Sequence, residues 1–296
     1  MYIDTHCHLT FPQYDADRAM VIGNAKKAGV KQFINPGVDL FSSRQSISLA
    51  QKHAGVVFAA IGIHPYEAQH DPSVFHLEQI LLSSLSPKPY PLNPIIAIGE
   101  CGLDYHQYNG EAALGKKDKQ KRLFEEQLHL ALKYNLPVIM HCRDGTSNVP
   151  AASDAAGAAF DRGAFNDFFE VLDSLPSQPK GVIHCFSGGL QEVREAKRRG
   201  LFIGIDGNVT YSKHLQTIIP SIPLSMILLE TDAPYLTPLP HRGTRNEPKH
   251  IPIIAKKIAE LKDMARKDVE TTTTANAYLL FPIPKISSGF DKRRSP

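Results

Sequence analysis

The sequence Ile3-Asp4-Thr5-His6-Cys7-His8 lies at the start of the chain, where an apolar strand runs directly into two histidines. Side chains alternate across a β-strand, so residues two positions apart point to the same face. His6 and His8 are therefore expected to project together from the end of this strand, while Cys7 points to the opposite face. Such a pair is one half of a metal site, whose acidic and imidazole partners must come from elsewhere in the chain.

Seven further apolar segments are typical of strands, and helical segments separate them. Strands are expected over Tyr2–Cys7, Lys31–Asn35, Val56–Ile61, Ile95–Cys101, Val138–Cys142, Gly181–Phe186, Leu201–Ile205 and Met226–Glu230. Near-continuous apolar runs indicate strands that are covered on both faces, and alternation of strands with helices implies parallel βαβ units. We predict an α/β protein with a (β/α)8 TIM barrel fold; a doubly wound open sheet is the alternative.

The helices are indicated by apolar spacing and by residues that cap or end them. The clearest helix is Lys117–Tyr134, whose apolar residues recur at i, i+4, i+7 and i+8. Asn135 is expected to end it in a left-handed conformation. Earlier in the chain, Asp15 is a candidate N-cap for the first helix, and Ser42 or Ser43 for the second.

The domain organisation is simple, because no internal boundary is marked in the sequence. Residues 1–282 are predicted to form a single domain, and residues 283–296 a disordered carboxyl-terminal tail. The segment Asp144–Gly163 is rich in Ala, Ser and Gly and is interpreted as an irregular insertion. Because it leaves the fifth strand on the side where barrel active sites lie, it is a candidate lid.

Composition excludes several classes of protein. The chain has 296 residues, 42% of them hydrophobic and 21% charged, with a formal net charge of +3. This charge tolerates an anionic substrate but lacks the clustered basic stripe of a protein that coats nucleic acid. No apolar run is long enough for a transmembrane helix, and the amino terminus does not have the pattern of a secretory signal.

Ligand-type residues follow five of the eight predicted strands. Active sites of (β/α)8 barrels lie at the carboxyl ends of the strands, so these side chains are expected to meet at one mouth of the barrel. The candidate ligands, four histidines and two carboxylates, are His6, His8, Glu100, His141, His184 and Asp232. Each alone would more often be a hydrogen-bonded or solvated residue. Their coincidence predicts a metal site.

The donor types constrain the metal. Imidazole and carboxylate ligands suit Zn²⁺, Mn²⁺, Fe²⁺, Ni²⁺ or Co²⁺, the affinity order favours Zn²⁺ over Mn²⁺, and Mg²⁺ is also considered. Six ligands exceed the needs of one tetrahedral site, so we predict two divalent ions, about 3.5–4 Å apart and bridged by a carboxylate. Such a pair lowers the pKa of bound water, which is hydrolysis chemistry that requires neither a nucleophilic side chain nor a redox centre.

The positions of the cysteines indirectly support the predicted direction of the ligand side chains toward the barrel interior. The four are Cys7, Cys101, Cys142 and Cys185, and none belongs to a Cys-x-x-Cys pair. Each is adjacent in sequence to a candidate ligand, so alternation is expected to send all four thiols outward beneath the helices, where they pack rather than bind metal. Such sparse usage predicts a reducing compartment, and we expect a cytoplasmic location.

The chain resembles the TatD family of metal-dependent deoxyribonucleases, which belong to the amidohydrolase-like barrels. The resemblance rests on several motifs that occur in the same order as in the family. The motifs are Ile3-Asp4-Thr5-His6-Cys7-His8-Leu9, Gly62-Ile63-His64-Pro65, Ile98-Gly99-Glu100-Cys101-Gly102-Leu103-Asp104-Tyr105, Pro137-Val138-Ile139-Met140-His141-Cys142-Arg143, His184-Cys185-Phe186-Ser187-Gly188, Leu229-Glu230-Thr231-Asp232-Ala233-Pro234-Tyr235-Leu236 and Arg242-Gly243 to Asn246-Glu247-Pro248. The resemblance covers residues 1 to about 281. The long Asp144–Gly163 segment and Asp206-Gly207-Asn208, in place of a commoner Ser-Gly, depart from the family pattern.

The resemblance implies roles for the candidate ligands. One metal would be held by His6, His8 and Asp232, the other by His141 and His184, with Glu100 bridging. It implies hydrolysis of DNA phosphodiester bonds by a metal-activated water, in exonuclease or endonuclease mode. Asp232 and Glu100 are thus the candidate catalytic residues, and Asp232 could also accept the proton of the nucleophile. DNA is the expected substrate, and the protein is expected to be a monomer without an obligatory protein partner.

Candidate phosphate contacts lie near the same strand ends. They are His64, Arg143, Ser187, Gly188, Arg242 and Arg245, with Gly189, His241 and Lys249 close to them in sequence. Arg143 carries a planar donor fork that suits phosphate oxygens. The Ser187-Gly188-Gly189 turn precedes a helix whose backbone N–H groups could receive a phosphate. A purely structural or solvated role is the alternative for each.

Two other functions remain open from the residues alone. The same metal site could hydrolyse a carboxylic ester or amide, such as a lactone, a cyclic amide or an aminoacyl-tRNA ester, because polarising a carbonyl and a phosphoryl oxygen makes similar demands. The basic residues after the eighth strand favour phosphate. A non-catalytic binding module would be expected to have lost at least one ligand, and all six are intact.

Overall fold

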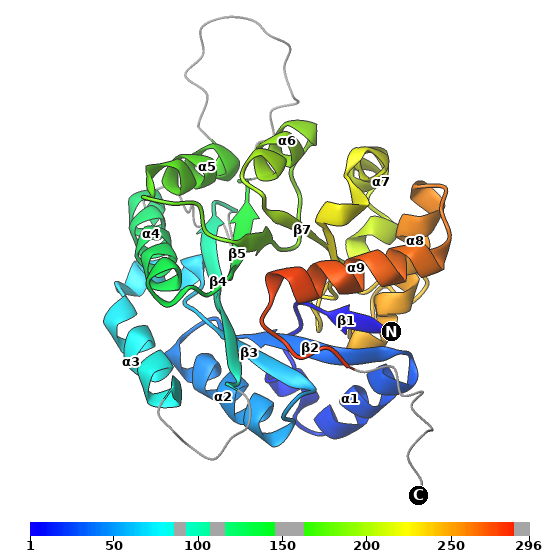
Figure 1. The fold of residues 1–296 in the computed structure, drawn as a ribbon, viewed down its shortest axis with the longest axis horizontal. Helices are drawn as coiled ribbons and strands as arrows, with labels where there is room; N and C mark the ends of the chain where they lie inside the picture. Colours follow the sequence, from blue (N-terminus) through cyan, green and yellow to red (C-terminus); the bar gives the residue numbers. More distant parts are fainter. Residues whose placement is uncertain (86–92, 107–115, 146–162, 287–296) are drawn as a thin grey trace, which may run out of the picture.

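Each strand of the sheet pairs in parallel with the next strand along the chain, from β1 to β8. The computed structural model describes residues 1–85, 93–106, 116–145 and 163–286. Its strands are β1 (Tyr2–Asp4), β2 (Val30–Pro36), β3 (Val57–Ile61), β4 (Ile95–Asp104), β5 (Val138–Arg143), β6 (Gly181–Ile183), β7 (Phe202–Ile205) and β8 (Ile227–Leu229). Figure 1 shows them gathered around one centre with helices outside. The predicted (β/α)8 barrel is confirmed.

Hydrogen bonds beyond the end of β1 close the ring of strands. The Thr5 N–H donates to the carbonyl of Leu229 at 3.0 Å, and the Asp232 N–H donates to the carbonyl of His6 at 2.9 Å. Cys7 also forms a parallel bridge with Ala233. The first and last strands are therefore neighbours, and the segments that follow them run side by side to the same mouth.

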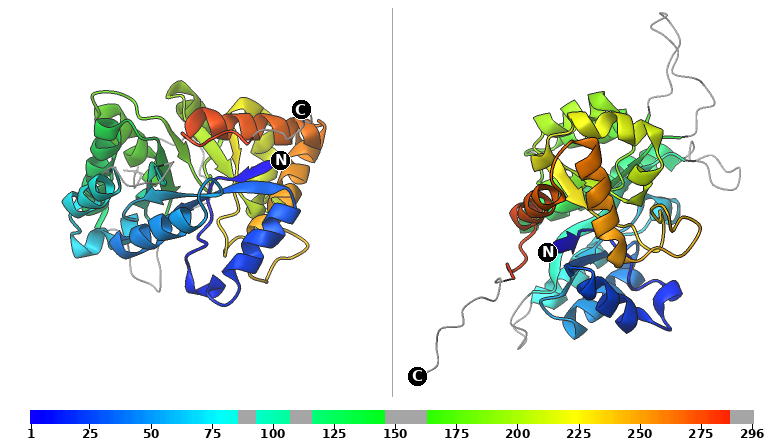
Figure 2. Two further views of the ribbon diagram at one scale, coloured as in Figure 1. Left: turned by 60° about the horizontal axis from the view of Figure 1, so that its bottom comes forward. Right: turned by 90° about the vertical axis from the view of Figure 1, so that its right-hand side faces the viewer.

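Helices cover the outside of the barrel (Figures 1 and 2). They are α1 (Arg18–Lys27), α2 (Leu40–Lys52), α3 (Val74–Leu85), α4 (Lys117–Tyr134), α5 (Ala164–Ser174), α6 (Leu190–Arg198), α7 (Lys213–Ile218), α8 (Ile251–Leu261) and α9 (Arg266–Leu280). The bounds of α4 match the prediction, and Asn135 ends it with φ 50° as expected.

Two predicted helix caps are wrong by a few residues. The α1 helix begins after Asp17 rather than Asp15. The N-cap of α2 is Asp39, whose carboxylate accepts a hydrogen bond from the Ser42 N–H at 2.6 Å. Ser42 instead occupies the third position of a reciprocal capping box, because its hydroxyl in turn accepts the Asp39 N–H at 3.0 Å.

The barrel interior is filled by apolar side chains from the strands, and α9 lies across its amino-terminal end. Ile3, Ile34 and Phe58 from successive strands belong to one buried cluster with Leu280 and Phe281. This packing closes the end of the barrel opposite the ligand residues. The open end is therefore the one at which the strands point their carboxyl termini.

The folded part of the chain continues past the predicted domain end at 282. Ile283 is buried in the same cluster as Phe281, and the Pro284 carbonyl accepts a hydrogen bond from the Gln32 side chain at 2.9 Å. A tail that starts at 283 is therefore wrong for these two residues. Residues 287–296 of the predicted tail and most of the predicted Asp144–Gly163 lid, residues 146–162, lie outside the described residues. In the part of the chain that is described, no helix has the length and apolar character needed to cross a membrane.

Candidate metal centre

The ligand side chains lie at the mouth of the barrel, on the same faces of their strands as the side chains that fill its interior. Ile139 and Val182 face the interior cluster, and His141 and His184 follow two residues later on the same face of their strands. Glu100 lies within β4 and is 3% exposed. The burial of the interior residues thus fixes the direction of the histidines above them.

His6 and His8 share one direction although β1 ends at Asp4, three residues earlier than predicted. The extended backbone continues because the Cys7 N–H donates to the Ile34 carbonyl at 3.1 Å and the His8 N–H to that of Ala233 at 2.8 Å. The alternation predicted for a regular strand therefore holds.

One set of four donor atoms surrounds a common point. It comprises Nε2 of His6, Nε2 of His8, Oε2 of Glu100 and Oδ1 of Asp232. The two nitrogens are 3.1 Å apart, and the four nitrogen–oxygen distances are 3.4, 3.6, 3.5 and 3.6 Å. Four ligands at about 2.0–2.1 Å from a central ion lie about 3.3–3.4 Å from one another when the site is tetrahedral. These distances fit a bound divalent cation.

A second set uses the other oxygen of the same glutamate. Oε1 of Glu100 lies 3.0 Å from Nδ1 of His141 and 2.8 Å from Nε2 of His184. The two imidazole nitrogens are 3.0 Å apart. Glu100 therefore presents one oxygen to each set.

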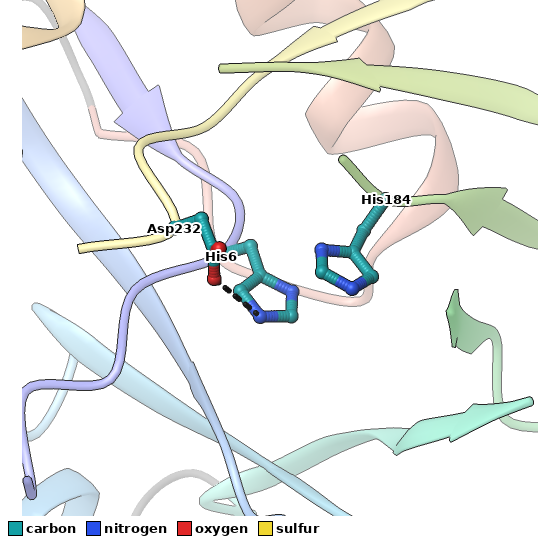
Figure 3. A group of neighbouring side chains, drawn as sticks. All are labelled: His6, His184 and Asp232. Atoms are coloured by element: carbon teal, nitrogen blue, oxygen red, sulfur yellow. Dashed lines mark ion pairs between the residues drawn. The ribbon is translucent and has the colours of Figure 1, made fainter. Parts of the chain in front are cut away.

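The two sets are adjacent, as Figure 3 shows for His6, His184 and Asp232. The rings of His6 and His184 are stacked with centroids 3.9 Å apart and an interplanar angle of 7°, and the Asp232 carboxylate lies beside His6. Both histidines are buried. Lone pairs of buried imidazole and carboxylate groups that face one another repel unless protons or cations lie between them, so the chemistry of the donors also fits bound metal.

The electrostatics of the site favour a cation. Burial alone would raise the pKa of Glu100, but the neighbouring imidazoles of His184, His6 and His141 lower it well below its usual range. Burial lowers the pKa of His6 to about 4, which leaves its ring neutral at pH 7. Burial likewise opposes the charge of His141, but hydrogen bonds to Asp104 and Glu100 prevail and raise its pKa to about 9. The carboxylates thus attract positive charge to this point.

Two carboxylates behind the centre were not predicted as site residues. Oδ2 of Asp104 lies 3.4 Å from Nε2 of His141, and Oε1 of Glu230 lies 3.8 Å from Nδ1 of His184. Both acids are buried. Acidic partners at hydrogen-bond distance orient histidine ligands and raise their basicity, and Asp104 is the nearer of the two acids to its histidine. Asp104 stands four residues after Glu100, so alternation along a longer fourth strand was the available signal.

Two glycines make room for this arrangement. Gly102 has φ 144°, and a Cβ there would lie 1.9 Å from the carbonyl oxygen of His141. A Cβ on Gly204 would lie 2.3 Å from Oε2 of Glu230. The close approach of β4 to β5 and the position of the Glu230 carboxylate both depend on a missing side chain.

A cleft of about 730 Å³ opens over the centre. Its lining includes five of the six candidate ligands, namely His8, Glu100, His141, His184 and Asp232. Aromatic and apolar residues form its upper walls, among them Phe11, Val38, Tyr66, Tyr235 and Leu236. Sequence patterns did not identify these wall residues, because they follow the strands in loops without periodicity.

Three of the predicted phosphate contacts reach this cleft. His64, Arg143 and Ser187 line it, and Nε2 of His64 is 3.6 Å from Oε1 of Glu100. Gly188 is buried, and its carbonyl oxygen lies 3.0 Å from Nε2 of His214. The Gly189 N–H, at the start of α6, already donates to Glu192 at 2.8 Å. This turn therefore has one N–H donor fewer for binding a phosphate than predicted.

The two predicted arginines after β8 have other contacts. The Arg245 guanidinium binds both oxygens of Asp17, at 2.9 and 2.7 Å, and lies over the ring of Tyr14. Arg242 is exposed and lies over the ring of Tyr211, 4.3 Å from its centroid. Neither arginine lines the cleft. Because Arg245 already has an acidic partner that matches its fork, it ties the loop to the α1 region.

The cysteine prediction is confirmed in part. All four thiols are free, and Cys7 and Cys101 are fully buried as expected. Cys142 and Cys185, however, line the cleft. Cys185 is only half-buried because β6 ends at Ile183 and the backbone then turns, with φ 47° at Cys185, so strand alternation no longer applies. The candidate metal clusters among the described residues contain histidine and carboxylate donors only.

Known proteins are similar to this chain in sequence. Residues 3–282 match the family model of TatD related DNases. Over 285 residues the chain is 35% identical to the metal-dependent hydrolase YabD of Bacillus subtilis, with 96% of this chain and 100% of that protein covered. Over 287 residues it is 34% identical to the 3′-5′ ssDNA/RNA exonuclease TatD of Cronobacter sakazakii, with 94% and 97% covered.

A solved structure agrees with this assignment. The crystal structure of YJJV, a TatD homologue of Escherichia coli K12, matches with a TM-score of 0.78 and 29% identity over 96% of this chain and 98% of that one. The family model spans nearly the whole barrel, including every candidate ligand. This chain belongs to the family of TatD related DNases.

Proposed function

We propose that this protein is a metal-dependent nuclease that hydrolyses phosphodiester bonds in DNA at a centre of two divalent ions. The observation that carries the proposal is the placement of Glu100, whose two oxygens face two different sets of imidazole nitrogens. A carboxylate so placed can bridge two cations. The relatives TatD and YabD are named an exonuclease on ssDNA and RNA and a metal-dependent hydrolase, which supports the same reaction here.

The proposed ligand sets follow the two groups of donor atoms. His6, His8 and Asp232 hold one ion, His141 and His184 hold the other, and Glu100 is shared. When bound, two such ions polarise the phosphoryl oxygen and provide a water nucleophile at neutral pH. Zn²⁺ is the proposed ion because imidazole and carboxylate donors at near-tetrahedral spacing suit it; Mn²⁺, Mg²⁺, Ni²⁺, Fe²⁺ and Co²⁺ are the alternatives that metal analysis would distinguish.

Asp232 is the proposed general base. Its Oδ1 lies 3.6 Å from both His6 and His8, at the face of the centre that lines the cleft. Burial alone would raise its pKa, but the neighbouring imidazoles of His8 and His6 lower it. Asp232 is therefore ionised near pH 7 and can take a proton from the attacking water.

Arg143 and His64 are the proposed phosphate contacts. Both line the cleft next to the centre. The planar guanidinium of Arg143 can donate two parallel hydrogen bonds to non-bridging phosphate oxygens, and Nε2 of His64 lies 3.6 Å from Oε1 of Glu100, the oxygen that faces the second donor set. Together they would orient the scissile phosphate toward the ions.

The decisive test combines metal analysis with DNA cleavage. The purified protein should contain close to two divalent ions, and it should cleave an oligonucleotide in a reaction that stops with chelator. Glu100→Ala should lose both metal and cleavage. Glu67→Ala removes a carboxylate from the same cleft but from neither donor set, so it should retain both.

The outcomes separate nuclease from other chemistry. Cleavage that survives Glu100→Ala would come from a contaminating enzyme. Turnover of a lactone, cyclic amide or aminoacyl ester without any turnover of DNA would assign the centre to carboxylic ester or amide hydrolysis instead. Either result overturns the proposal.

We further propose that the enzyme works as a monomer in the cytoplasm. The four free cysteines suit a reducing compartment, and both proposed metal sets are complete within one chain. Size-exclusion chromatography with light scattering and subcellular fractionation would test these two statements. A dimer whose dissociation abolishes metal binding would contradict the first.

A further inference from the structure

Three aromatic rings, those of Phe11, Tyr66 and Tyr235, line the cleft over the proposed metal centre. Phe11 stacks on the ring of His8 with centroids 4.4 Å apart and an interplanar angle of 15°. Tyr235 meets Phe11 edge to face, with centroids 6.3 Å apart and an interplanar angle of 72°. Tyr235 is 50% exposed, and Tyr66, which also lines the cleft, is 46% exposed. Large rings at the surface of a concave site mark a place where a partner can cover them.

The position of Tyr235 relative to the centre is fixed by its backbone. Its N–H donates to the carbonyl of Asp232 at 2.9 Å, and its carbonyl accepts a hydrogen bond from the side chain of Asn246 at 2.6 Å. Asn246 is fully buried and also donates to the carbonyl of Thr231 at 2.9 Å. The turn that carries the proposed base Asp232 therefore also carries the ring, and the same hydrogen bonds hold both in place.

The position of Phe11 is also fixed by a backbone hydrogen bond. It follows His8 by three residues, and its N–H donates to the His8 carbonyl at 3.1 Å. Its ring covers one face of the His8 imidazole, whose Nε2 belongs to the first donor set. The Phe11 ring is thus separated from the proposed ion by the His8 imidazole alone, and the Tyr235 ring lies next to Phe11.

We propose that Phe11 and Tyr235 form a stacking platform for an unpaired base of the strand, at a nucleotide next to the scissile phosphate. The inference rests on the proposed nuclease function. Aromatic side chains bind bases of any sequence through their faces, and each contact contributes substantially to binding of single strands. A base inside a duplex has both faces covered by its neighbours, so the platform selects nucleotides that are unstacked. The platform therefore makes Tyr235 a determinant of strand preference.

Matched variants separate stacking from other roles of this tyrosine. Tyr235→Ala removes the exposed ring, whereas Tyr235→Phe keeps the ring and removes only the hydroxyl. Phe75→Ala is the control, because Phe75 is 60% exposed and does not line the cleft. Metal content and Tm are measured for each variant to show that the centre and the fold are intact.

The substrate supplies the second half of a double-mutant cycle. Tetrathymidylate is compared with four versions that each carry one abasic residue, at every position in turn. At one position, loss of the base should lower kcat/KM of the wild type about 5-fold to 100-fold, the range for one base–aromatic contact. On intact substrate, Tyr235→Ala should show the same decrease in kcat/KM, mainly through a higher KM. With the substrate that is abasic at that position, kcat/KM of Tyr235→Ala should fall no further. Tyr235→Phe and Phe75→Ala should behave as the wild type.

The result that overturns the platform is equally specific. If Tyr235→Ala discriminates between intact and abasic substrates as strongly as the wild type at every position, the ring does not contact a base. Dissociation constants for the same five oligonucleotides, measured by fluorescence anisotropy in chelator, repeat the cycle without turnover. Absence of any cleavage by the metal-loaded wild type would count against the nuclease function alone, while the binding cycle still decides for or against stacking.

Discussion

Oε1 of Glu230 lies 3.8 Å from Nδ1 of His184, at the ring nitrogen opposite the one that faces Glu100. Glu230 is fully buried, and its Oε1 also accepts the Cys185 N–H at 2.5 Å. This hydrogen bond holds the backbone directly after His184, and it keeps the Glu230 side chain beside the imidazole. Glu230 is therefore a positioning residue for the second donor set.

Glu230→Gln and Glu230→Ala are expected to weaken binding of the ion held by His141 and His184. The affinity should fall about 10-fold to 100-fold, as for other partners of metal-bound histidines. Calorimetric titration of metal into the metal-free variants would measure this change, with Glu260→Ala, an exposed glutamate on α8, as control. If both Glu230 variants bind metal at both sites with the affinity of the wild type, Glu230 does not position His184.

Asp232→Asn is expected to retain most of the bound metal and lose most of the turnover. The amide can still offer an oxygen to the ion, but it cannot accept a proton from water. A loss of kcat of about 100-fold or more fits removal of a general base. Metal content and kcat are measured on the same preparation. Loss of metal in proportion to activity would reduce Asp232 to a ligand.

Chelation is expected to destabilise the folded chain. Buried donors that face one another at 2.8–3.6 Å are stabilised by cations between them, and metal at about 100 times its Kd contributes about 2.7 kcal/mol. For a chain of this size that corresponds to a decrease in Tm of about 5 °C on removal. Differential scanning calorimetry with EDTA, followed by added Zn²⁺, would measure it. Glu100→Ala should show little response, and an identical response would contradict the assignment.

Arg245→Ala is expected to lower stability and leave chemistry intact. Its fork holds the loop after β8 to Asp17 through two hydrogen bonds, so its loss should reduce Tm, and lysine should not restore it because an ammonium cannot form the paired contact. Arg242→Ala, whose side chain is exposed, is the control. A rise in KM for DNA in Arg245→Ala, at unchanged Tm, would instead restore the phosphate role that the sequence suggested.

Gly102→Ala is expected to destabilise the barrel strongly. A methyl group at φ 144° would collide with the His141 carbonyl, and the combined backbone strain and clash should cost about 3 kcal/mol or more. Gly23→Ala is the matched control: it lies in α1 with open space around its Cβ position, so it should be neutral or stabilising by about 0.5–1 kcal/mol. Urea denaturation of both variants would compare them. Equal midpoints would show that β4 and β5 can separate without cost.

The candidate centre was largely predictable from local pattern. Apolar runs identified eight strands, and period-two alternation assigned the direction of His141 and His184 from buried residues two positions earlier. The same rule held for His6 and His8, although β1 is shorter than predicted, because their backbone stays extended and hydrogen-bonded. Such features depend on residues close in sequence.

Other features depended on where the strands end and on contacts between residues far apart in sequence. Asp104 became a partner of His141 because β4 is three residues longer than its apolar pattern. Cys185 reached the cleft because the backbone turns after β6. Arg245 took Asp17, 228 residues away, as its acidic partner.

The sequence by itself therefore determined the barrel, the six proposed ligands and the end of the barrel at which they meet. Only the tertiary structure decided that each oxygen of Glu100 faces a different set of nitrogens, and that Phe11 and Tyr235 stand beside them. The reason is physical: the period of a strand sets the face on which a side chain lies. Its exact partners are chosen by packing between segments that are distant along the chain.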